Sequence, residues 1–141
     1  MITLKRETKE TSIEIELTLY GKGESDIQTG IPFFDHMLNA LSKHSRIDLK
    51  LLCKGDIEVD FHHSVEDCGI ALGEALHRAI FPVSNMQRFG SATAILDEAA
   101  IECNIDLSNR PYLHYDLEMD GKIGEFDCEL VEEFFKSLTF K

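Results

Sequence analysis

The sequence is poor in positive charge. Its 141 residues include 14 Lys and Arg against 26 Asp and Glu, which gives a formal net charge of -12. The basic residues are scattered, with no arginine-rich run. Binding to nucleic acid or to an anionic membrane surface needs dense Lys and Arg. The composition therefore argues against both of these partners.

Long apolar runs are also missing. No stretch approaches the roughly 18 apolar residues of a membrane-spanning helix. The N-terminal segment MITLKRETKETSIEIELTL is interrupted by charges throughout, unlike a signal or transit peptide. A content of 43% apolar residues fits one globular domain of this length. We expect a cytoplasmic protein.

The cysteines form no closely spaced pairs. The four cysteines, Cys53, Cys68, Cys103 and Cys128, are far apart in the sequence. This spacing argues against a zinc ribbon and against a disulfide framework. We expect reduced thiols that behave as small buried apolar residues.

Alternating apolar and polar residues predict several half-buried strands. In residues 12–20, for example, Ile13, Ile15 and Leu17 alternate with polar side chains. The same reasoning predicts strands at 46–52, 56–61, 100–107 and 112–119, with a turn at 54–56. One-sided alternation of this kind is typical of antiparallel sheets with one wet face.

Three segments have helical periodicity: 32–44, with Pro32 at its first position, 62–80 and 127–140. The first and third place apolar residues at i, i+1, i+4, i+5 and i+8, with an offset of 97 positions. This match indicates a duplicated unit in an α+β fold, with a first repeat at 1–85 and an incomplete second repeat at 86–141. The alternative is that any amphipathic helix shows such spacing.

A polar cluster opens the second helix. His62, His63 and Glu66 project from one side of its first turn, away from the apolar stripe. Asp67 is a candidate acceptor that orients an imidazole. His77 lies roughly 16 Å beyond Glu66 along the axis and is excluded from the cluster.

This cluster has the donor types of a metal site. Imidazole with carboxylate suits Mn, Fe, Ni or Zn. Adjacent histidines diverge by about 100°, which favours two metals, or one metal and one substrate contact. The alternative is a solvated polar face. His36 is a further candidate ligand, and His44 is interpreted as a packed or substrate-edge residue.

The motifs TGIPFFDHML and GDIEVDFHHSVEDCGIALGEAL closely resemble those of imidazoleglycerol-phosphate dehydratases of histidine biosynthesis. The agreement continues, in order, through RETKET near the N-terminus, RFG, LDEA, DLSNRPY and GEFDCELVEEFF. The resemblance covers nearly the whole chain.

The resemblance implies a fold and an assembly. The fold would be a duplicated α+β unit, like domain 2 of ribosomal protein S5, with helices packed against antiparallel or mixed sheets. Trimers would build a 24-subunit shell in the full-length family, with two Mn²⁺ ions per site at subunit interfaces. The metal ligands would be His36, His62, His63 and Glu66, with Glu133 as a possible further one.

The resemblance also implies a reaction, the dehydration of imidazole glycerol phosphate to imidazole acetol phosphate. Glu10 and Glu66 would be catalytic, and Arg88 and Arg110 would bind the phosphate, as guanidinium geometry allows. Substrate contacts would come from Glu10, His36, His44, His62, Arg88, Asp97 and Arg110, with Glu98 nearby.

The sequence departs from the family mildly in SVEDCGI, where TVEDTAI is more usual, and more strongly in two other places. Phe61 stands where members usually have Asp. Members also continue past the position of Lys141 into a second His-His-x-x-Glu motif and a Lys-bearing tail. We therefore expect this chain alone to be inactive or nearly so, and to form a trimer that covers Phe134, Phe135 and Phe140. The alternative to an enzyme is a catalytically incompetent metal-binding or oligomerisation domain.

Overall fold

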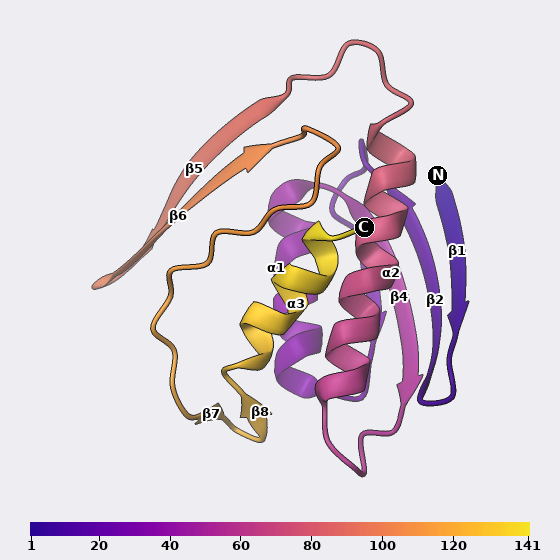
Figure 1. The fold of residues 1–141 in the computed structure, drawn as a ribbon, viewed down its shortest axis with the longest axis vertical. Helices are drawn as coiled ribbons and strands as arrows, with labels where there is room; N and C mark the ends of the chain where they lie inside the picture. Colours follow the sequence, from indigo (N-terminus) through magenta and orange to yellow (C-terminus); the bar gives the residue numbers. More distant parts are fainter.

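The computed structural model describes residues 1–141 and begins with a four-stranded sheet (Figure 1). Its strands are β1 (Ile2–Glu7), β2 (Thr11–Thr18), β4 (Asp48–Gly55) and β3 (Ser25–Gln28), in that spatial order. β2 pairs antiparallel with β1 and β4, whereas β3 runs parallel to β4. The sheet is therefore mixed.

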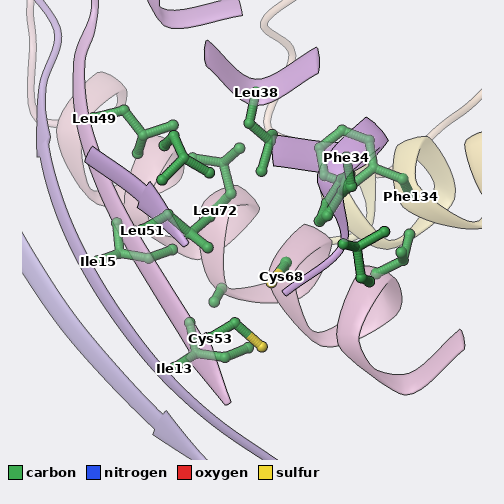
Figure 2. Packing of buried hydrophobic residues seen from close by; sticks show 14 of the residues in the cluster. Ile13, Ile15, Phe34, Leu38, Leu49, Leu51, Cys53, Cys68, Leu72 and Phe134 are labelled. Atoms are coloured by element: carbon green, nitrogen blue, oxygen red, sulfur yellow. The ribbon is translucent and has the colours of Figure 1, made fainter. Parts of the chain in front are cut away.

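Two helices, α1 (Pro32–Ser45) and α2 (His62–Ile80), cover one face of this sheet, and a third, α3 (Leu130–Thr139), packs against α2. Figure 2 shows sheet residues such as Ile15 and Leu51 facing Leu38 of α1 and Leu72 of α2, all of them buried. The opposite face is polar, and cross-strand ion pairs join Lys5 to Glu14 and Lys50 to Glu16. This one-sided core confirms the α+β class.

Two glycines let α3 approach α2 closely. A Cβ on Gly69 would lie 2.8 Å from the carbonyl oxygen of Phe134, and one on Gly73 would overlap that of Leu138. α3 also reaches α1, because the rings of Phe34 and Phe134 pack edge to face at 5.4 Å. α3 therefore packs against the other two helices.

The later part of the chain contains little buried structure. β5 (Phe89–Leu96) and β6 (Ala99–Asp106) pair only with each other, and every residue in them is exposed. Figure 1 shows this hairpin extending away from the helices. The short strands β7 (Lys122–Ile123) and β8 (Phe126–Asp127) precede α3.

Two strand predictions are wrong. Residues 56–61 form a turn that leads into α2, with Val59 exposed. Residues 112–119 have no strand partner, although Leu113, Tyr115 and Leu117 keep the expected alternation of burial. The expected strand at 46–52 is present as β4, shifted by a few residues.

The cysteine prediction holds for three of the four residues. Cys53, Cys68 and Cys128 are free and buried, whereas Cys103 is free and exposed on β6. None of the helices combines the length and apolar character needed to cross a membrane.

Candidate active site at the start of helix α2

His62 and Glu66 lie side by side on the first turn of α2. The Nε2 atom of His62 is 3.6 Å from a carboxylate oxygen of Glu66, and both side chains are nearly half exposed. The backbone N–H of His62 donates to the carboxylate of Asp60 at 2.9 Å, which supports the beginning of the helix. An imidazole and a carboxylate are thus presented together to solvent.

His63 has a different partner. Its Nδ1 atom is 2.8 Å from Oδ2 of Asp56, at the end of β4. The hydrogen bond with Asp56 raises the pKa of His63 above its usual value. Burial opposes this rise, while the charges of Asp56, Glu10 and Asp60 add to it. The two neighbouring rings stand almost perpendicular, with centroids 6.1 Å apart.

The prediction that Asp67 orients an imidazole is wrong. Asp67 is buried and accepts hydrogen bonds from Arg6 at 2.9 Å, Thr11 at 2.5 Å and Thr8 at 3.3 Å. Burial works against its ionisation, but the bonds from Thr11 and Arg6 lower the pKa of the carboxyl below its usual value. At helical spacing Asp67 turns toward β1 and β2, away from the exposed histidines.

Asp67 thereby holds the turn that carries Glu10. The Thr8 hydroxyl accepts from the backbone N–H groups of Glu10 and Thr11, at 3.2 and 2.9 Å. Glu10 itself is exposed, and its charge acts on His63. The expected catalytic carboxylate is therefore on the same side of the molecule as the histidines.

The other expected ligands do not join this group. His36 and His44 are exposed on α1, so the interpretation of His44 as a packed residue is wrong. Glu133 is half buried on α3. No three His, Cys, Asp or Glu side chains lie close enough together to hold one metal ion within this chain.

The two expected phosphate ligands flank one carboxylate. Arg88 donates to both oxygens of Asp106, at 2.7 and 3.1 Å. The pKa of Asp106 is lowered chiefly by the hydrogen bond from Arg88, and the charge of Arg110 adds to the effect. Asp97 and Glu98 lie apart from both arginines, in the turn between β5 and β6.

The arginines are close in sequence to residues that lie near the C-terminal end of α2. The amide oxygen Oδ1 of Asn109, next to Arg110, accepts a hydrogen bond from Nε2 of His77 at 2.8 Å. His77 is fifteen positions beyond His62, which is about 22 Å along a helix. Within a single chain, therefore, the arginines and the histidine pair do not face a common space.

Sequence reasoning missed Asp56 as the partner of His63. The signal was present, because Asp56 directly follows the last strand before the helix. It was hidden by the alternation of 56–61, which predicts a strand where the chain makes a turn.

Comparison with known proteins gives consistent results. The family model described as imidazoleglycerol-phosphate dehydratase matches residues 29–141. The chain is 60% identical over 140 residues to the imidazoleglycerol-phosphate dehydratase of Nitratiruptor sp., covering 99% of this chain and 74% of that protein. The corresponding enzyme of Campylobacter fetus is 58% identical over 139 residues, with 99% and 73% covered.

Solved structures agree in fold. The chain is 32% identical to the imidazoleglycerol-phosphate dehydratase of Staphylococcus aureus, with a TM-score of 0.84 over 99% of this chain and 78% of the other. The Pyrococcus furiosus enzyme in complex with (S)-C348 has 33% identity and a TM-score of 0.81, over 96% and 72%. This chain belongs to the imidazoleglycerol-phosphate dehydratase family of histidine biosynthesis.

Proposed function

We propose that the start of α2 is part of a metal-dependent site that dehydrates imidazole glycerol phosphate to imidazole acetol phosphate. The observation that carries the proposal is the arrangement of His62, His63 and Glu66 on one helical turn. His62 lies beside Glu66, and His63 keeps its Nε2 atom free. A cytoplasmic location is part of the same proposal.

The donor set fits Mn²⁺ in type. Imidazole nitrogens and carboxylate oxygens are ligands that suit this ion. His62, His63 and Glu66 would hold the metal, with His36 contributed to a shared site and Glu133 as a further candidate ligand. Manganese, when bound, supplies Lewis-acid stabilisation of negative charge on the imidazole ring of the substrate.

Proton transfer, phosphate binding and the other substrate contacts would be carried out by residues of the chain. Glu10 and Glu66 would move the protons, Glu10 from its exposed turn beside His63. The substrate loses a proton from carbon and then its hydroxyl group, and the resulting enol becomes the ketone. Arg88 and Arg110 would hold the phosphate through charge-assisted hydrogen bonds. His36, His44 and Asp97 would complete the substrate contacts.

The distance between the two groups supports assembly. Arg110 follows Asn109, which contacts His77, and His77 lies about 22 Å from His62 along α2. This is too far for one small substrate. A second copy would bring its arginines to the histidine pair of the first. Phe135 and Phe140, 41% and 53% exposed, are apolar surface for such a contact, whereas Phe134 is buried within the chain. We propose a trimer.

The same geometry supports weak activity at most for these 141 residues alone. Three donors divided between two ions leave each ion poorly coordinated, since a divalent ion takes four to six ligands. The alternative function is a metal-binding or oligomerisation domain without catalysis, and the exposed rings of Phe135 and Phe140 favour the oligomerisation role.

A comparison of two chain lengths tests the proposal. The 141-residue chain and a version continued through the second His-His-x-x-Glu motif are titrated with Mn²⁺ by calorimetry and assayed for dehydration of imidazole glycerol phosphate. We expect weak binding and no turnover for the first, and tight binding, a larger assembly and turnover for the second.

Each other result has a defined meaning. Tight binding of two ions and turnover by the 141-residue chain would show that the site is self-contained. If the longer chain binds metal but remains inactive, Phe61→Asp is the first variant to assay. An inactive longer chain that also binds no Mn²⁺ would contradict the metal-dependent function.

A further inference from the structure

Asp56 is placed in an unusual way for a surface carboxylate. Its side chain is 20% exposed. One carboxylate oxygen, Oδ2, lies 2.8 Å from Nδ1 of His63. The other, Oδ1, is buried and has no hydrogen-bond partner. The single polar contact of this carboxylate is therefore with the imidazole ring.

Two backbone features hold Asp56 close to His63: the approach of Gly55 to α2, and the turn that follows Asp56. Gly55, the last residue of β4, has no side chain, and a Cβ there would overlap the hydroxyl of Ser64 in α2. The first turn of the helix consequently lies directly against the end of the strand. The carbonyl of Asp56 accepts from the N–H of Val59 at 2.8 Å, which closes the connecting turn.

This contact determines which nitrogen of the neutral ring carries the proton. A neutral imidazole has one N–H donor and one acceptor nitrogen, whereas an ionised carboxylate only accepts. Nδ1 of His63 must therefore carry the hydrogen, and Nε2 keeps its lone pair. A metal ion needs the nitrogen without hydrogen.

We propose that Asp56 is a positioning residue, which accepts the Nδ1 hydrogen of His63 and holds the ring with Nε2 free to bind a divalent metal. The inference rests on the proposed metal-dependent function and adds a residue to it. Metal-binding histidines generally donate their second nitrogen to such an acceptor, which fixes both the tautomer and the orientation of the ring.

A comparison with Asp67 separates this role from a structural one. Asp67 joins three segments of the fold, and both of its oxygens accept hydrogen bonds. Asp56 leaves one buried oxygen unpaired, which is unfavourable for folding. A carboxylate whose main role was stability would have both oxygens satisfied.

Three variants of the 141-residue chain test the proposal. Asp56→Ala removes the acceptor. Asp56→Asn keeps the shape but weakens acceptance, and serves if the first variant does not fold. Asp60→Asn is the control, because it removes another charge that acts on His63 and retains an oxygen for the N–H of His62.

The first measurement is the tautomer of His63, read from ¹⁵N spectra of the metal-free protein at a pH where the ring is neutral. The second is the affinity for Mn²⁺, from calorimetry. We expect a hydrogen on Nδ1 in the unsubstituted chain and in Asp60→Asn. In both Asp56 variants the hydrogen moves toward Nε2, and Asp56→Ala loses about 10-fold or more in Mn²⁺ affinity.

An unchanged tautomer in Asp56→Ala, or an equal loss of affinity in Asp60→Asn, would overturn the proposal. If the unsubstituted chain bound no Mn²⁺, the weak binding expected of these 141 residues would be contradicted, and the positioning of a metal ligand within this chain would fail with it. The tautomer measurement distinguishes these cases, because it needs no metal.

Discussion

At the scale of single residues, Asp67 shows how a buried charge is stabilised. Its carboxylate ties α2 to the strands on either side of the Thr8–Thr11 turn. Sequence periodicity placed this residue on the correct helix but gave it the wrong partner. The three donors come from positions about 60 residues earlier, and no local pattern identifies them.

Thr11→Val should lower the free energy of unfolding at pH 7 by about 1–3 kcal/mol, because a buried acceptor loses a donor. The folded state lowers the pKa of Asp67 below its usual 3.8. The stabilisation is therefore present above that value and is lost as the pH falls through the folded pKa. The difference between variant and parent should shrink in acid.

Urea denaturation at several pH values measures this effect. Thr18→Val is the matched control, since Thr18 lies on the same strand and its hydroxyl makes no hydrogen bond within the chain. Equal decreases in the free energy of unfolding of the two variants would contradict a specific role for the Thr11 hydroxyl.

At the scale of elements, helices were easier to predict than strands. The predicted and observed bounds of α2 agree. A helical period of 3.6 residues that is kept over 19 residues fits few structures other than a helix. Residues 56–61 alternate as a strand does, yet the approach of Ser64 to Gly55 forces a turn there. Residues 112–119 alternate too, but a strand also needs a hydrogen-bond partner, and the sequence pattern does not reveal whether one is available.

The contact between α2 and α3 gives a prediction at this scale. Gly73→Ala should destabilise the fold by about 1–3 kcal/mol, since the added methyl group meets the backbone of Leu138. In an isolated helix alanine is more favourable than glycine by about 1 kcal/mol. The expected loss of stability is therefore opposite to the effect of helix propensity alone.

Gly90→Ala on β5 is the control, because a Cβ there meets nothing within 4 Å. Urea denaturation of both variants gives the comparison. A more stable Gly73→Ala protein would show that α3 can move away from α2 without loss.

At the scale of the whole molecule, stability is unevenly distributed. The four-stranded sheet and three helices bury a core of 19 residues, whereas no residue of β5 or β6 is buried. The exposed side chains of this hairpin include Phe89, Ile95 and Leu96, all more than 60% exposed. The predicted repeat boundary at residue 85 stays a prediction, but it falls where the buried part of the fold gives way to this hairpin.

This difference predicts the pattern of amide hydrogen exchange. A two-stranded hairpin is at best marginally stable in water, so amides of β5 and β6 should be protected about 100-fold less than those of β2 and β4 in dilute protein. Residues 112–119, which have no strand partner, should exchange as fast as the hairpin. If copies of the chain associate through the hairpin, its protection should rise with protein concentration while that of β2 and β4 remains constant. Strong protection of β5 and β6 at every concentration would mean that the hairpin packs against its own chain, contrary to the arrangement in Figure 1.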